Sequence, residues 1–157
     1  MSNAVVLATA PLDDYATGVL SAFGQFRVTP DIKESTLAGM MDGVVALAVR
    51  GAAPITEAVL ANAPALRVIG RTGVGYDSID IAAATRRGIP VVYAPGAGAP
   101  AVAEATFAFM LALCKQVMHW DRELKAGNWN SRLGVQGGDL DGKVLGMHGG
   151  VHRFTIG

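Results

Sequence analysis

Residues 66–113 read LRVIGRTGVGYDSIDIAAATRRGIPVVYAPGAGAPAVAEATFAFMLAL, and this stretch decides the fold. It opens with a short apolar run at 68–69, which suits a buried strand. The run leads into a loop with three glycines, Gly70, Gly73 and Gly75. Glycine permits positive φ angles and close backbone approach, so such a loop can point bare N–H groups at an anion.

Beyond the loop, the same stretch continues as a helix and a second strand. Asp80 is a typical first residue for a helix over 82–87, and Gly88 is a typical stop. Residues 89–92 then form a short apolar strand, which ends before the Pro-Gly pair at 95–96. A strand, loop, helix and strand imply a parallel pair with a right-handed crossover, and ligands collect at the carboxyl ends of such strands. We therefore predict a binding site at the glycine loop.

The residues before this stretch repeat the alternation of strands and helices. Strands are predicted at 4–8, 26–29 and 44–49, and helices at 11–24, 32–41 and 55–61. The strand at 44–49 is almost wholly apolar, as expected for a strand covered on both faces. The predicted fold class is α/β, a parallel sheet with helices on both faces.

The residues after the second strand have a different character. Residues 100–117 predict one long helix that is apolar on nearly all faces, so we expect it to be buried between domains or between subunits. A more polar helix is predicted at 118–126. Residues 128–139 are rich in glycine and polar side chains and are typical of an arm or linker.

Composition limits the possible partners and compartment. A chain of 157 residues suits one domain and part of another, and its 13 Lys and Arg balance 13 Asp and Glu. This balance argues against nucleic acid and membrane surfaces as partners. The apolar run at 99–114 is interrupted by Glu104 and is too short to span a membrane. The single cysteine, Cys114, cannot form an internal disulfide, and no secretory signal opens the chain, so we expect the cytoplasm.

The run GRTGVGYDSID at 70–80, with RGIPV at 87–91, the Pro-Gly pair at 95–96 and VAE at 102–104, strongly resembles the D-isomer-specific 2-hydroxyacid dehydrogenases. This family includes D-3-phosphoglycerate dehydrogenase. The likeness runs from about residue 44 to residue 146. It implies three parts: a flavodoxin-like substrate-binding domain at 1–99, connecting helices and an arm at 100–139, and the truncated start of a Rossmann, dinucleotide-binding domain at 140–157.

The resemblance also implies roles for individual residues. Gly73, Val74 and Gly75 match the loop whose N–H groups meet the substrate carboxylate, and Val74 borders the nicotinamide of NAD or NADP. Arg50 matches a position that contacts substrate in parts of the family, with a plain surface arginine as the alternative. Thr106 matches a position near the cofactor. The implied substrate is a small 2-hydroxy or 2-oxo acid.

Other residues near the loop and the long helix have structural interpretations. Arg71 either binds an anion or braces the loop, and we favour bracing. Glu104 is expected to favour the helix dipole and cap the first turn rather than act in catalysis. The family often has asparagine where this chain has Tyr93 and Gly98, which alters the hydrogen bonding expected around the loop. Cys114 is expected to be buried and inert.

Two pairs of side chains near the carboxyl end are not expected to act in chemistry. His119 and Trp120 are expected to serve packing. His148 and His152 have a helical metal-ligand spacing, but the two glycines between them disfavour a helix and no third ligand is near, so we predict no metal site.

The family's dinucleotide fingerprint, G-x-G-x-x-G, is expected to follow 140–146. The sequence there reads MHGGVHRFTIG, and no register fits: from Gly149 the next glycine positions hold Val151 and Phe154, and from Gly150 they hold His152 and Thr155. The substrate-orienting Arg, the acid-base His and its partner Glu of the family have no counterparts either. We therefore expect a truncated substrate-binding portion of an NAD(P)-dependent dehydrogenase, with no catalytic residues, no bound coenzyme and no turnover. A frameshift or premature stop after Gly146 would explain the change.

Two alternatives remain. The chain could be a non-catalytic α/β module for small-molecule binding or oligomerisation, or a complementary chain could supply the missing half. In each case the apolar helix at 100–117 and the arm predict a homo-oligomer or larger assembly, because an exposed apolar patch of this size drives association.

Overall fold

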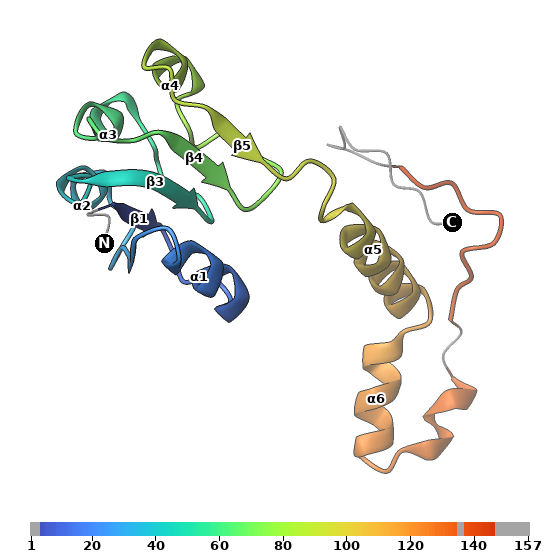
Figure 1. The fold of residues 1–157 in the computed structure, drawn as a ribbon. Coiled ribbons are helices and arrows are strands. Elements are labelled where there is room, and N and C mark those ends of the chain that lie inside the picture. Colours follow the sequence, from blue (N-terminus) through green and yellow to red (C-terminus); the bar gives the residue numbers. More distant parts are fainter. Residues whose placement is uncertain (1–3, 135–136, 147–157) are drawn as a thin grey trace. The chain divides into compact units, whose positions relative to one another are not determined.

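A computed structural model describes residues 4–134 and 137–146 (Figure 1). The chain divides into two compact units, one ending at Ala97 and the other beginning at Gly98. The first unit alternates strands and helices in this order: β1 (Val5–Ala8), α1 (Asp14–Ser21), β2 (Gln25–Val28), α2 (Glu34–Gly39), β3 (Val44–Val49), α3 (Glu57–Ala61), β4 (Val68–Arg71), α4 (Ile81–Arg86) and β5 (Val91–Tyr93).

The five strands form one parallel sheet in the order β2-β1-β3-β4-β5. This order is the flavodoxin-like arrangement, in which the direction of winding reverses between β1 and β3. All five carboxyl ends lie at the same edge, because every pairing is parallel. The predicted parallel α/β sheet is confirmed.

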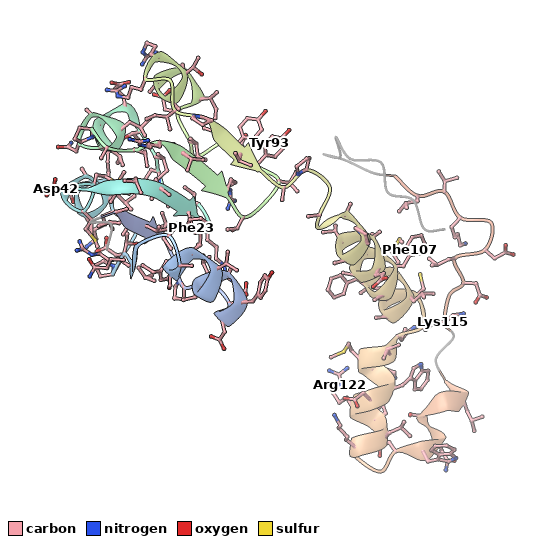
Figure 2. The ribbon with its side chains drawn as sticks, viewed as in Figure 1. Phe23, Asp42, Tyr93, Phe107, Lys115 and Arg122 are labelled. Atoms are coloured by element: carbon pink, nitrogen blue, oxygen red, sulfur yellow. The ribbon has the colours of Figure 1, made fainter. Side chains whose placement is uncertain are left out.

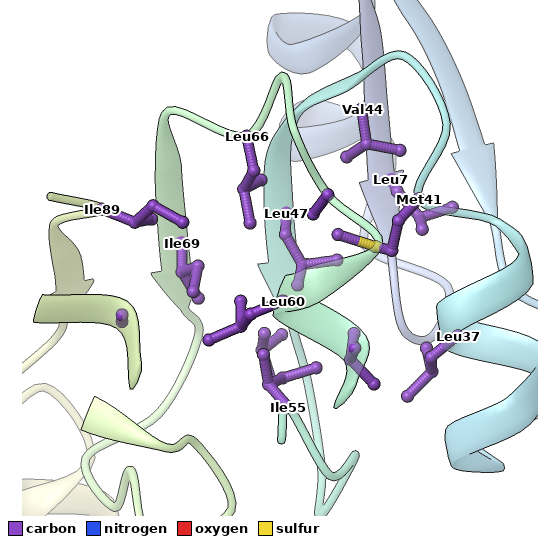
Figure 3. Close-up of a cluster of buried hydrophobic side chains, with 14 of the residues drawn as sticks. Leu7, Leu37, Met41, Val44, Leu47, Ile55, Leu60, Leu66, Ile69 and Ile89 are labelled. Atoms are coloured by element: carbon purple, nitrogen blue, oxygen red, sulfur yellow. The ribbon is translucent and has the colours of Figure 1, made fainter. Parts of the chain in front are cut away.

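One face of the sheet holds the hydrophobic core (Figure 3). Leu47 of β3 is 1% exposed and lies in a cluster with Leu7 of β1 and Ile69 of β4. Helices α2, α3 and α4 add buried side chains to the same cluster, among them Leu37 and Leu60. Three helices therefore cover this face.

Helix α1 lies on the other face of the sheet. Because side chains alternate along a strand, Val6 and Ala8 of β1 lie on this face. Of the apolar positions predicted for this helix, Tyr15 and Val19 are exposed and Leu20 is half-buried, and no residue of α1 is buried. Phe23, which is also exposed, lies just beyond the end of α1 (Figure 2). Between α1 and the sheet lies an open apolar groove of about 500 Å³. The sheet side of this groove includes the small residues Ala48 and Gly70 as well as Val92 and Tyr93 of β5.

The helix ends follow the signals in the sequence. The Asp80 carboxylate accepts the Ala83 N–H at 2.8 Å, and Gly88 has a φ of +67° just after α4. Helix α3 is tied to α4 by Glu57, which pairs with Arg86 at 2.8 Å and with Arg87. Hydrogen bonds from Arg87 and Arg86 hold the pKa of Glu57 below its ordinary value.

Strand boundaries differ from the sequence prediction by one or two residues, and the largest differences are in β4 and β5. Strand β4 runs on to Arg71, two residues into the predicted glycine loop, because Gly70 and Arg71 pair with Ala48 and Val49 of β3. Strand β5 begins at Val91 rather than at residue 89, since the preceding residue is proline and has no N–H to donate to a ladder.

The second unit comprises helix α5 (Ala99–Cys114), helix α6 (Val117–Lys125) and a 3₁₀ helix, η1 (Trp129–Leu133). The predicted helix to residue 117 is wrong at its carboxyl end. Gln116 adopts a left-handed conformation with a φ of 53°, and this ends α5 and starts α6 at a new angle.

The arm returns to the junction of α5 and α6. The Gly138 N–H donates to the Cys114 carbonyl at 2.7 Å, and Lys115 forms an ion pair with Asp139. The Lys115 ammonium lowers the pKa of Asp139. The arm thus satisfies a carbonyl that the end of α5 leaves without a helical partner.

Most of helix α5 is exposed. Only Ala103 is buried, whereas Phe109 and Leu113 are 69% and 78% exposed. In the part of the chain that is described, no single helix is long and apolar enough to cross a membrane. Helices α5 and α6 reach that length and composition only together, with a bend of 60° between them.

The expected start of a dinucleotide domain is described only in part. Residues 140–146 form a turn around Gly142 and no strand. Residues 147–157, which include the expected fingerprint position and the pair His148 and His152, lie outside the described residues.

Candidate functional site

The candidate site lies at the carboxyl edge of the sheet, where β3 and β4 end side by side. Val49 and Arg71 are paired as the last residues of these two strands. Arg50 and Thr72 therefore occupy the next position on neighbouring strands, and the 73–75 loop follows directly. The sheet itself brings the predicted arginine and the predicted loop to one edge.

Arg71 braces the loop from beneath. Its Nε donates to the Gly75 carbonyl at 2.7 Å, and its Nη1 donates to the Val49 carbonyl at 3.2 Å. The Thr72 N–H also donates to the Val49 carbonyl, at 3.1 Å. These bonds tie both ends of the loop to the end of β3, which confirms the structural interpretation of Arg71.

Two glycines of the loop, Gly73 and Gly75, lie close to neighbouring charged side chains. None of Gly70, Gly73 and Gly75 has a positive φ, so that part of the sequence prediction is wrong. A Cβ on Gly73 would lie 3.4 Å from the Arg71 Cζ, and one on Gly75 would lie 3.2 Å from a carboxylate oxygen of Asp77. Glycine lets the guanidinium pass directly under the loop.

Three consecutive N–H groups of the loop are available to a ligand. Within residues 4–134 and 137–146, the N–H groups of Gly73, Val74 and Gly75 donate to no protein acceptor. The backbone here is only partly buried. Successive free N–H groups beside a guanidinium supply hydrogen-bond donors and positive charge, which suit a carboxylate.

Arg50 presents an exposed guanidinium at the end of β3. Its Nη1 donates to the Pro11 carbonyl at 2.5 Å, across the end of β1. The N–H and the carbonyl of Arg50 both form hydrogen bonds with the hydroxyl of Thr9. Both the main chain and the guanidinium of Arg50 therefore bond to residues 9–11.

Thr9 and Thr29 were not found by the sequence reasoning. Both are buried polar residues that directly follow strands, β1 and β2. The Thr29 hydroxyl donates to the Thr9 carbonyl at 3.2 Å. The only available signal was a threonine placed immediately after each apolar run, which also suits an ordinary strand end.

Tyr93 stands at the end of β5, where the family often has asparagine. Its ring meets Tyr76 edge to face, with centroids 5.3 Å apart (Figure 2). An aromatic pair thus borders the loop next to Gly75 in place of an amide. Gly98, the second departure, is the N-cap of α5 and offers no side-chain cap.

In the second unit, the predicted residues have structural contacts. The Thr106 hydroxyl donates to the Val102 carbonyl of its own helix at 2.7 Å. Glu104 lies beyond the first turn of α5, so the predicted cap is wrong. Cys114 is partly exposed rather than buried.

The His119 ring packs edge to face on Trp120, with centroids 4.8 Å apart. Its Nε2 atom is buried without a partner among the described residues. No group of three metal-ligating side chains occurs in the described part of the chain.

Comparison with known proteins finds a matching family and relatives of this chain. The sequence model of one family, D-isomer specific 2-hydroxyacid dehydrogenase, catalytic domain, matches residues 5–138. The D-3-phosphoglycerate dehydrogenase of Methanocaldococcus jannaschii is 38% identical over 144 residues, which cover 92% of this chain and 27% of the relative. The chain therefore spans about a quarter of the length of that curated relative.

Two solved structures share the fold. The 2-hydroxyacid dehydrogenase of Ketogulonicigenium vulgare Y25 superposes with a TM-score of 0.70 at 28% identity, covering 83% of this chain and 42% of its own. The NADPH-dependent glyoxylate/hydroxypyruvate reductase of Sinorhizobium meliloti, solved with NADP and malonate, gives 0.71 at 21% identity, covering 87% and 42%. The match over residues 5–138 includes the whole sheet, the braced loop and Arg50, and the chain accordingly belongs to the family of D-isomer-specific 2-hydroxyacid dehydrogenases.

Proposed function

We propose that these 157 residues form the substrate-binding portion of an NAD(P)-dependent D-2-hydroxyacid dehydrogenase. The observation that carries this proposal is the braced loop at the end of β4, whose N–H groups at Gly73, Val74 and Gly75 have no acceptor among the described residues. The ligand is a small 2-hydroxy or 2-oxo acid, held by its carboxylate.

The chemistry of the site suits such an acid. A carboxylate accepts several hydrogen bonds, and bonds to a charged group are shorter and stronger than neutral ones. The Arg71 guanidinium under the loop adds positive charge while its own N–H groups bond to Gly75 and Val49. Arg50, one strand away, offers further N–H groups to the substrate.

We further propose that these residues alone bind no coenzyme and transfer no hydride. The 157 residues contain no G-x-G-x-x-G fingerprint, and the Thr106 hydroxyl is already bonded within α5. Hydride transfer to a carbonyl also needs a proton donor beside the carbonyl. Within the described residues, the braced loop and Arg50 supply hydrogen-bond donors but no acid-base histidine.

We also propose a domain organisation and a cellular compartment. The substrate domain extends over 1–99, the connecting helices and arm over 100–139, and the dinucleotide-binding domain begins at 140. A single cysteine is consistent with a cytoplasmic protein.

We infer a homo-oligomer formed through α5 and the arm, with a second copy as the occupant of this surface. The support is the apolar, exposed side of α5, which includes Phe109 and Leu113. Sedimentation equilibrium at micromolar concentration is expected to give at least a dimer. A monomer at all concentrations would contradict the inference.

Two titrations and one activity assay test the function. The 157-residue chain is expected to bind oxalate, a small dicarboxylate, to leave NADH fluorescence unchanged, and to oxidise no 2-hydroxy acid in the presence of NAD or NADP. Turnover would overturn the claim of inactivity, whereas failure to bind oxalate would overturn the substrate-binding role. A non-catalytic module of another kind is favoured if anions bind but 2-oxo acids do not compete with them.

A further inference from the structure

Thr9 makes an unusual pair of contacts with one distant residue. It is 2% exposed and directly follows β1. Its hydroxyl accepts the Arg50 N–H at 2.8 Å and donates to the Arg50 carbonyl at 3.0 Å. One buried side chain therefore satisfies both main-chain polar groups of Arg50, which lies 41 positions further along the chain.

These contacts extend the sheet beyond its last paired residues. The ladder between β1 and β3 ends at Ala8 and Ala48, and the Thr9 N–H still donates to the Ala48 carbonyl at 2.9 Å. The hydroxyl then bridges to Arg50, where the main chains would otherwise separate. This point is where the winding of the sheet reverses, and in open α/β folds such a point forms a binding crevice.

The same short segment also holds the other end of Arg50. The Pro11 carbonyl, two residues after Thr9, accepts the Arg50 Nη1 at 2.5 Å. Main chain and guanidinium are thus fixed by residues 9–11. A movement at Thr9 must therefore shift both anchors of Arg50 together.

We propose that Thr9 is a positioning residue of the anion site: its buried hydroxyl clamps the main chain of Arg50 and so sets where the guanidinium stands. This rests on the proposed function, in which Arg50 meets the substrate. Thr9 itself is almost fully buried, so it acts through Arg50 and does not touch the ligand.

The chain offers a matched control in Thr29. It is also buried, also follows a strand, and its hydroxyl donates to the Thr9 carbonyl at 3.2 Å. Among the described residues, the Thr29 side chain forms no hydrogen bond with Arg50, whose partners are Thr9 and Pro11. Thr29→Val therefore removes a buried hydroxyl from the same edge of the sheet and leaves the clamp on Arg50 in place.

The test compares Thr9→Val, Thr9→Ser, Thr29→Val and Arg50→Met in the full 157-residue chain. Oxalate affinity is measured by calorimetry, and the order of the Arg50 side chain is measured by the ¹⁵N heteronuclear NOE of its Nε–H group. Arg50→Met is expected to weaken oxalate at least about tenfold, the size of a lost hydrogen bond to a charged group. Thr9→Val is expected to weaken it about three- to tenfold and to lower the NOE. Thr9→Ser keeps the hydroxyl, so it and Thr29→Val are expected to stay within about twofold of the parent, with the NOE unchanged.

Each outcome decides the question. If Thr9→Val leaves both the NOE and the affinity unchanged, or if Thr29→Val reduces them equally, the positioning role is wrong. If the parent chain does not bind oxalate, the proposed function fails, and the NOE comparison still decides whether Thr9 orders Arg50. If Thr9→Val does not fold, hydrogen exchange of the Arg50 amide in the parent replaces it. Slow exchange supports the clamp and fast exchange contradicts it.

Discussion

Replacing Leu47 with alanine is expected to lower the free energy of unfolding by about 2 to 5 kcal/mol. Leu47 is 1% exposed in the middle strand of the sheet, and its register partners are Leu7 of β1 and Ile69 of β4. Removing its side chain opens a cavity that the surrounding sheet cannot close. Since domains of this size are stable by about 5 to 15 kcal/mol, the variant loses a large share of its stability. Urea denaturation followed by circular dichroism measures the change.

Leu113→Ala is the matched control for this prediction. The same side chain is truncated in α5, but Leu113 is 78% exposed. Its loss is expected to change the free energy of unfolding by less than about 0.5 kcal/mol when both proteins are measured at a dilution at which the proposed oligomer is dissociated. Equal effects of the two substitutions would show that the core is not where the buried cluster places it.

Replacing Arg71 with methionine is expected to weaken the binding of oxalate to the loop at least about tenfold. The substitution keeps a long apolar side chain but removes the hydrogen bonds to the Gly75 and Val49 carbonyls. The loop then loses both its anchor and the positive charge beneath it. Calorimetric titration with oxalate measures the loss, and circular dichroism checks that the sheet is intact.

Arg67→Met serves as the control on the same strand segment. Arg67 is exposed and precedes β4, at the opposite end of the strand from the loop. The net charge changes by the same amount, so a general electrostatic effect would appear in both variants. If Arg67→Met weakens oxalate as much as Arg71→Met does, the loop is not the binding site.

The sheet was predictable because its signals are local. Strands β1 and β3 are short apolar runs, and the residues that start and stop α4, Asp80 and Gly88, act within one turn of the chain. The errors occur where a distant contact decides the structure. Strand β4 extends to Arg71 because β3 lies beside it, and α5 ends at Cys114 because Gln116 turns left-handed.

The candidate site was predictable in part, for a related physical reason. The family resemblance identified Arg50 and the 73–75 loop, and the parallel sheet brings them to one edge. The close approach of the Arg71 guanidinium to Gly73 depends on where that side chain lies, which no local pattern encodes. Thr9 was missed because its partner is 41 positions away and a threonine after a strand is common.

The exposure of α1 could not be predicted from the period of its sequence. Spacing shows that Tyr15 and Val19 share one side of a helix, but it does not show what lies opposite. An open groove separates α1 from the sheet residues opposite, which include Ala48 and Gly70.

Binding of a carboxylate by the 73–75 loop can be tested directly by one measurement. The ¹⁵N-labelled chain is titrated with oxalate while the amide resonances are recorded. Saturable shifts are expected at Gly73, Val74 and Gly75 and at Arg50, with the same affinity whether or not NADH is present. Resonances of the loop that stay fixed while oxalate binds elsewhere, or shifts that never saturate, would contradict the account.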